Sequence, residues 1–132
     1  MLEKCLVIGL GKIGMGYDLD LDPTVAIFSH ARAISLHPYF ELVGAVDSSN
    51  LQRSIFEKYY NCPAFDDISA AIMVLRPTVV IIASPTETHA NILNQVLSQE
   101  KPKVIMCEKP LAYDLVEARQ MVDACDEEGV NL

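Results

Sequence analysis

The chain is predicted to fold as an α/β protein with a doubly wound, mostly parallel sheet, because short apolar runs alternate with longer segments of helical periodicity. Runs of this length and composition are typical of strands buried on both faces. Their alternation with helical segments indicates a parallel sheet covered by helices on both sides. The predicted strands are Cys5–Ile8, Leu42–Val46, Val79–Ile82 and Val104–Cys107, with a weaker one at Pro63–Phe65.

Two helix starts are marked by their first residues. Asp114–Glu117 has the pattern of a capping box, apolar residues follow at helical spacing, and Gly129 is predicted to end this helix. A second start lies at Ser84–Glu87, where Pro85 suits the first helical position. Ser84 and Glu87 are expected to act as capping residues in preference to ligand contacts.

Composition excludes several classes of partner. The net charge is -8 and the isoelectric point lies near 4.7, whereas binding of nucleic acid needs clustered Lys and Arg. The longest apolar run, Val79–Ala83, is far too short to span a bilayer. Near the N-terminus, Glu3 and the early glycine loop interrupt the continuous apolar region that a signal peptide needs. We therefore expect a cytoplasmic protein with a small-molecule partner, no nucleic-acid partner and no membrane partner.

The cysteines show no close pairing. Metal ligands usually come in pairs such as Cys-x-x-Cys, and no such pair occurs here. We therefore expect reduced thiols and no metal site. The four residues concerned are Cys5, Cys62, Cys107 and Cys125.

A glycine motif, Gly9–Gly14, directly follows the first predicted strand. Its Gly-x-Gly-x-x-Gly spacing permits a tight turn and lets a pyrophosphate approach the backbone N–H groups of a helix N-terminus. The motif alone is a weak signal, but the β/α order and Asp47 after the second strand favour a dinucleotide over a purely structural turn. A carboxylate at that position accepts hydrogen bonds from the adenosine ribose. The alternative for Asp47 is a helix cap within Asp47–Asn50.

The spacing of these residues indicates an insertion. Asp47 lies 33 positions after Gly14, whereas about 20 is usual. We place the extra residues in a loop at Met15–Asp22, which splits the first crossover helix, and expect the helix to restart at Asp22–Pro23.

The inserted loop is acidic. Asp18, Asp20 and Asp22 resemble the opening of a calcium loop, but Pro23 stands where that motif has glycine and Ser29 where it has its bidentate Glu. A solvated loop is therefore the favoured interpretation.

Three stretches together resemble the N-terminal half of the glucose-fructose oxidoreductase / inositol dehydrogenase (Gfo/Idh/MocA) family. They are Gly9–Gly14, Ala83–His89 and Cys107–Ala112, and Phe40–Asp47 is similar to the family's second strand. The Glu-Lys-Pro sequence within the third stretch is the most specific of them. The resemblance implies an NAD(P)-binding Rossmann domain of an oxidoreductase.

The resemblance also implies roles for individual residues. Glu108 would lie by the nicotinamide ribose, and Lys109 by the reacting carbon, where it polarises or protonates a substrate oxygen. Both residues follow a central strand, at the edge where open α/β sheets bind ligands; the alternative is a solvent-facing Glu-Lys pair. His89 would lie near the nicotinamide ribose, against the alternative of a partly exposed surface residue. The family's His after the last glycine matches His30, which implies an insertion of 13 residues.

The predicted cofactor is NAD, with NADP less favoured because an ionised Asp47 would repel a 2′-phosphate. Pro85 and Thr86 are expected to approach the cofactor through backbone and hydroxyl. Lys109 is the candidate catalytic residue. The candidate cofactor-binding residues are Gly9, Gly11, Lys12, Ile13, Gly14, Asp47, Ser84, Pro85, Thr86, His89, Glu108 and Lys109.

After Gly129 only Val130–Leu132 follow, and we interpret them as the start of a sixth strand, at which the sheet is truncated. Residues 1–132 are thus expected to form one dinucleotide-binding domain, with a C-terminal substrate domain absent from this chain. The fifth strand would then be an uncovered edge, so we expect a homo-oligomer.

The predicted function is hydride transfer between nicotinamide and a sugar, polyol or related hydroxyl or carbonyl compound. The complete protein would be the active enzyme, and this chain alone would be inactive. The alternative is a stand-alone NAD-binding sensor without catalysis, which the short length favours but which leaves Glu108–Pro110 unexplained. An adenosylmethionine-dependent methyltransferase also leaves that motif unexplained.

Overall fold

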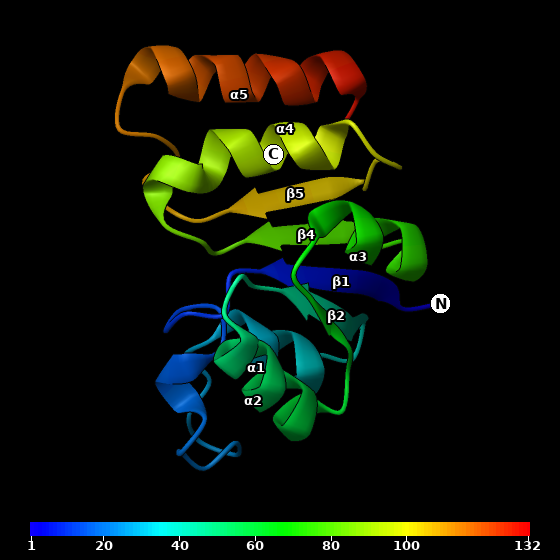
Figure 1. Ribbon diagram of the computed structural model, residues 1–132, viewed down its shortest axis with the longest axis vertical. Coiled ribbons are helices and arrows are strands. Elements are labelled where there is room, and N and C mark those ends of the chain that lie inside the picture. The colour runs from blue at the N-terminus through cyan, green and yellow to red at the C-terminus, as the bar shows by residue number, and fades with distance from the viewer.

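The computed structural model describes residues 1–132 and confirms the predicted fold class. A five-stranded, all-parallel sheet has the order β3-β2-β1-β4-β5 (Figure 1). All five predicted strands are present, with bounds shifted by at most two residues. The strands are β1 Glu3–Ile8, β2 Phe40–Val46, β3 Ala64–Phe65, β4 Val79–Ile82 and β5 Val104–Cys107.

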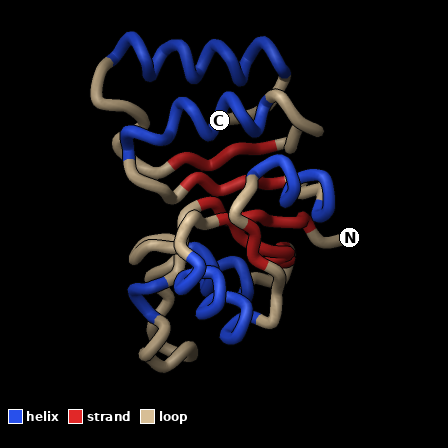
Figure 2. Tube along the Cα trace, viewed as in Figure 1, coloured by secondary structure: helices blue, strands red, loops and turns tan.

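Helices flank the sheet on both sides (Figure 2). One apolar core lies between the sheet and α1 and α2, and a second lies between the sheet and α3, α4 and α5. The α-helices are α1 His30–Leu36, α2 Asn50–Tyr60, α3 Ile68–Leu75, α4 His89–Leu97 and α5 Leu115–Glu128. Two short 3-10 helices, η1 Gly16–Asp18 and η2 Thr86–Thr88, precede α1 and α4. None of the helices is both long and apolar enough to cross a membrane.

Strand β1 shows why the apolar runs are continuous. Leu6 and Ile8 point into one core, while Cys5 and Val7 point into the other, and all four side chains are buried. Because successive side chains of a strand point to opposite faces, a strand covered on both faces needs apolar residues at every position.

The register of the sheet brings the strand ends together. Ile8 lies opposite Val46 on one side and Ile82 on the other, and Ile82 lies opposite Cys107. The residues that follow these four therefore emerge along one edge of the sheet. Asp47, Gly9, Ala83 and Glu108 are those residues, so segments far apart in the sequence share one site.

The α5 prediction is confirmed, and the α4 prediction needs correction. The Asp114 carboxylate accepts from the Glu117 N–H at 2.9 Å, and Gly129 ends α5 with a φ of 69°. Pro85, by contrast, stands before the η2 turn, and α4 begins only at His89. Neither η2 nor α4 has a side-chain cap, so Ser84 and Glu87 are not capping residues. The Ser84 hydroxyl accepts a hydrogen bond from the Thr88 hydroxyl instead.

The last residues lie beside β5. Asn131 forms a parallel bridge with Val104; its N–H donates to Lys103 and its carbonyl accepts from Ile105. The expectation of a fully uncovered edge is therefore wrong for the first half of β5.

Candidate functional site

An open cleft of about 790 Å³ lies at the carboxyl edge of the sheet. It extends from the glycine turn after β1 to the acidic residues after β2 and β3 and to the segment after β4. Seven of the predicted cofactor residues line it: Gly9, Gly11, Lys12, Ile13, Asp47, Ser84 and Pro85. The glycine turn, Asp47 and the segment after β4 thus share one cleft, whereas Glu108 and Lys109 line a separate groove beside β5.

The glycines of the turn meet different surroundings. Gly9 has a φ of 100°, and a Cβ there would lie 2.7 Å from the Ser84 nitrogen, so the protein itself requires glycine. A Cβ on Gly14 would overlap the Gly9 carbonyl oxygen, so packing within the turn requires glycine here, and Gly14 does not line the cleft. At Gly11, however, a Cβ would meet no atom within 4 Å. The open space at Gly11 fits the close approach of a ligand to the backbone.

The turn also offers free hydrogen-bond donors. The backbone N–H groups of the four residues in Gly11–Gly14 donate to no acceptor within the chain. Three of these donors, those of Gly11, Lys12 and Ile13, belong to residues that line the cleft, and they fit the pyrophosphate of a dinucleotide.

The insertion leaves the first helix in register. The His30 N–H donates to the Ile13 carbonyl, and the Ala31 N–H donates to the Gly14 carbonyl, both at 3.0 Å. In an uninterrupted helix these carbonyls would bond to residues four positions later. Here the partners are 17 positions later in each case, so 13 extra residues leave the helix and return to it. This agrees with the size of the insertion inferred from His30.

The helix does not restart at Asp22–Pro23, as the sequence led us to expect. Instead α1 begins at His30, with Ser29 as its N-cap. The carbonyls of Leu21 and Ala26, in the region where the helix was expected, instead accept from the Arg32 guanidinium, each at 3.0 Å.

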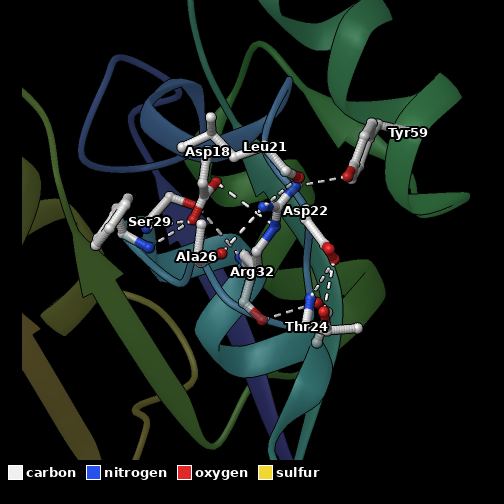
Figure 3. Close-up of polar contacts among 10 residues, drawn as sticks. Asp18, Leu21, Asp22, Thr24, Ala26, Ser29, Arg32 and Tyr59 are labelled. Atoms are coloured by element: carbon white, nitrogen blue, oxygen red, sulfur yellow. Dashed lines mark hydrogen bonds and ion pairs between the residues drawn. The ribbon is translucent and has the colours of Figure 1, made fainter.

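The prediction of a solvated acidic loop is wrong at Asp18. This carboxylate is fully buried and accepts from the N–H groups of Phe28 and Ser29, at 2.7 and 2.8 Å, and from the Ser29 hydroxyl (Figure 3). The Arg32 Nε lies 3.8 Å from it, and Arg32 also donates to the Tyr59 hydroxyl of α2. We call Asp18, Ser29, Arg32 and Tyr59 the insertion network.

The insertion network governs the ionisation of Asp18. Burial raises the pKa of Asp18, but the hydrogen bonds from Ser29 and Phe28 and the charge of Arg32 outweigh burial and hold the pKa below its usual value. Asp18 is therefore a charged structural group that fixes the inserted residues to α1.

Asp47 links the glycine turn to α2. One carboxylate oxygen accepts from the Leu10 N–H at 2.8 Å and the other from the Ser49 N–H at 2.7 Å. The N-cap of α2 is Ser49, so the capping role considered for Asp47 falls to its neighbour. Each oxygen keeps a lone pair free, and the carboxylate lines the cleft, as a ribose-binding group requires.

Glu108 is bound to the first residue of α1. Its Oε1 accepts from His30 Nε2 at 2.6 Å, across 78 positions of sequence, and both side chains are largely buried. The Glu108 N–H continues the β4–β5 ladder by donating to the Ile82 carbonyl at 2.9 Å. Because His30 also bonds to Ile13, the Glu-Lys-Pro segment is tied to the glycine turn through one residue.

Lys109 is exposed, and its ammonium group makes no hydrogen bond or ion pair within the chain. The peptide bond from Lys109 to Pro110 is cis. Burial, together with the neighbouring Glu108, raises the pKa of the Cys107 thiol to about 11, so this thiol stays protonated at neutral pH. Of the two charged side chains of the Glu-Lys-Pro segment, Glu108 is paired and Lys109 is not.

His89 is not a partly exposed surface residue. Its side chain is buried, with Nδ1 at 3.1 Å from the Leu111 carbonyl oxygen and Nε2 at 2.9 Å from that of Ser84. Both ring nitrogens thus face backbone carbonyls, and His89 joins the segment after β4 to the segment after β5. Thr86 lies in the η2 turn and, like His89, does not line the cleft.

Several residues of the cleft were not among the predicted site residues. Tyr17 belongs to the insertion, Asp66 follows the weak strand β3, and Gln52 donates its amide to the Leu10 carbonyl at 2.9 Å. The weak strand predicted at Pro63–Phe65 was the signal that could have indicated Asp66, since the residue after each parallel strand reaches the same edge.

Comparison with known proteins identifies the family. The model of the oxidoreductase family with an NAD-binding Rossmann fold (GFO_IDH_MocA) matches residues 3–132. The chain belongs to this family. The match is to an NAD-binding oxidoreductase domain and gives no support to the regulatory alternative.

Two curated relatives have a sugar as substrate in their names. The chain is 33% identical over 101 residues to a D-glucoside 3-dehydrogenase of Escherichia coli K12, covering 76% of this chain and 28% of the relative. It is 32% identical over 129 residues to a glucose-6-phosphate 3-dehydrogenase of Bacillus subtilis 168, covering 98% of this chain and 32% of the relative. The Gfo/Idh/MocA domain thus spans about a third of the length of these relatives.

A solved structure supports the fold. The WlbA dehydrogenase from Bordetella pertussis, determined in complex with NADH and UDP-GlcNAcA, matches with a TM-score of 0.81 at 23% identity. The match covers 98% of this chain and 36% of that one. At this identity the likeness concerns the fold alone.

Proposed function

We propose that the chain is the cofactor domain of an NAD-dependent dehydrogenase that acts on a hydroxyl or carbonyl group of a sugar, polyol or related compound. The observation that carries the proposal is the link between the NAD cleft and the Glu-Lys-Pro segment, in which His30 bonds both to Ile13 and to Glu108. This link holds a carboxylate beside the glycine turn, and the unpaired Lys109 is the next residue of the chain. A module that only senses NAD has no need of a free amine there.

The substrate class follows from the relatives. Both curated relatives named above are dehydrogenases of a glucose derivative at carbon 3. Each is about three times as long as this chain, so residues 1–132 would bind the cofactor and a further domain would hold most of the substrate.

In this proposal each residue of the Glu-Lys-Pro segment has a separate task. Bound NAD supplies the acceptor of the hydride, or NADH its donor. Glu108, fixed by His30, accepts hydrogen bonds from the nicotinamide ribose hydroxyls. The Lys109 ammonium donates a proton to the carbonyl oxygen during reduction, and the amine takes the proton from the hydroxyl during oxidation. His30 acts through Glu108 and is therefore a positioning residue.

His89 has a supporting task as well. Because it joins the Ser84 and Leu111 carbonyls, it fixes the distance between the segment after β4 and the segment that carries Lys109. We propose that it orients these segments around the nicotinamide instead of contacting the cofactor through a ring nitrogen. Ser84, Pro85 and Thr86 would supply the contacts on this side.

The experiment uses the complete protein that contains this chain. NADH formation is followed during oxidation of D-glucosides, glucose 6-phosphate and inositol, for the wild type and for Lys109→Ala. We expect turnover of at least one of these compounds and a fall in kcat of roughly a hundredfold or more in the variant, the range of general acid–base catalysis. NAD affinity should change far less.

Lys101→Ala is the matched control, since Lys101 is exposed and paired with Glu128 far from the cleft. The control should keep wild-type turnover. Equal kcat values for Lys109→Ala and the wild type would overturn the role of Lys109. NAD binding without turnover of any sugar or polyol would favour the alternative of an NAD-binding sensor without catalysis.

A further inference from the structure

We propose that Tyr17, which the insertion carries, is a cofactor-binding residue that closes the cleft over the pyrophosphate. The inference rests on the proposed use of the cleft for NAD. It gives the insertion a role in binding, whereas the spacing between the glycine motif and Asp47 shows only that extra residues are present.

The position of Tyr17 is the first argument. Its side chain lines the cleft together with Gly11, Lys12 and Ile13, the residues whose N–H groups are free. Its own N–H donates to the Lys12 carbonyl at 2.9 Å, which keeps the residue on the turn itself. The aromatic side chain of Tyr17 therefore lies beside the N–H groups to which a pyrophosphate would bind.

The unused bonding capacity of Tyr17 is the second argument. The side chain is 54% exposed, and its hydroxyl makes no hydrogen bond within the chain. Lys12 is the one cationic residue that lines the cleft, against the acidic Asp47, Asp66 and Asp67. A phenol hydroxyl adds a neutral donor for a doubly charged pyrophosphate where the cleft is short of positive charge.

The rigidity of the neighbouring backbone is the third argument. Asp18 follows Tyr17 directly and is locked in the insertion network, with three hydrogen bonds and Arg32 beside it. Figure 3 shows these groups converging on Asp18. An exposed aromatic residue is thus held in place by a buried ionic network, which lowers the conformational entropy that a ligand contact would cost.

The test measures binding of NAD, ADP-ribose and adenosine to the wild type, Tyr17→Phe and Tyr17→Ala. Calorimetry gives the affinities for NAD and ADP-ribose, and competition against NADH fluorescence gives that for adenosine. We expect Tyr17→Phe to weaken NAD and ADP-ribose roughly tenfold, the value of one hydrogen bond to a charged acceptor. Tyr17→Ala should weaken them by about thirtyfold, since the ring is lost too, while adenosine changes less than about twofold.

Phe28→Ala is the matched control, because Phe28 is an equally exposed aromatic residue of the insertion that does not line the cleft. It should bind all three ligands like the wild type. Unchanged NAD affinity in Tyr17→Ala overturns the inference, and so does an equal loss for adenosine and NAD. A wild type that binds no NAD is a different outcome, since it removes the proposed function itself.

Discussion

In the proposed function, single residues bind different parts of NAD. The role of Glu108 at the nicotinamide ribose gives the clearest test of this assignment. Glu108 does not line the cleft. Its carboxylate is hydrogen-bonded to His30, the first residue of α1. Glu108→Gln keeps a hydrogen-bond acceptor for His30 and removes the charge that ribose hydroxyls bind. We expect NAD affinity to fall roughly tenfold, with ADP affinity unchanged, as measured by calorimetry.

The exposed Glu87, whose carboxylate contacts only the Tyr113 hydroxyl, provides the control as Glu87→Gln. Equal losses of NAD and ADP affinity in Glu108→Gln would count against a place at the nicotinamide end.

The sequence predicted the residues of local motifs well. The turn Gly9–Gly14 and Asp47 lie where the motif and the end of the second strand put them, because these positions depend on neighbouring residues and on the strand ends. The contact of His30 with Glu108 spans 78 positions, and no local pattern signals it. The burial of His89 between two carbonyls likewise depends on two loops that meet only in the fold.

Among the elements, the insertion shows where pattern reasoning failed. Alternating acids in a polar stretch are typical of a solvated loop, and Asp20 is indeed exposed. Asp18 differs because the Phe28 and Ser29 N–H groups and the Ser29 hydroxyl donate to it, and Arg32 of the following helix lies beside it. Helix α1 begins at His30, and the N–H groups of Phe28 and Ser29 just before it donate to Asp18 instead of to a preceding helical turn.

We expect Asp18→Asn to lower the free energy of unfolding by about 2–4 kcal/mol, because it leaves buried Arg32 without its counter-charge. Urea denaturation measures the loss, and Asp20→Asn is the control, with no change expected. A change below about 0.5 kcal/mol in Asp18→Asn, the ordinary range of a surface substitution, would show that the pair does not hold the insertion.

The same carboxylate predicts a pH dependence. The pKa of Asp18 is lower in the folded chain than its usual value, so the unfolded state binds the proton more readily. Asp18 therefore stabilises the fold above the unfolded value near pH 4, and this contribution is lost as the pH falls through the lower folded value. The acid side of the stability curve should be shallower in Asp18→Asn. An identical curve in the wild type and the variant would contradict this.

At the scale of the whole molecule, the exposed surface beside β5 is where we expect two copies of the chain to associate. Met106 is half exposed and lies in a shallow groove with Leu111, Val122 and Leu132, and Asn131 covers only the start of the strand edge. We expect the chain to self-associate through this surface. Light scattering should show a mass above that of the monomer that falls in Met106→Lys, whereas a clean monomer at high concentration would contradict the expectation.

The account as a whole depends on the cleft being an NAD site with an acidic ribose end. Asp47, Asp66 and Asp67 line it, and the Arg53 side chain, one turn into α2, already donates to the backbone carbonyls of Asp47 and Ser48. Calorimetric titration of NAD and NADP, on the wild type and on Asp47→Ala, is the most direct test. We predict tighter binding of NAD than of NADP by the wild type, and a loss of NAD affinity of about ten- to a hundredfold in Asp47→Ala. Tighter binding of NADP by the wild type, or NAD affinity that Asp47→Ala leaves unchanged, would contradict the account.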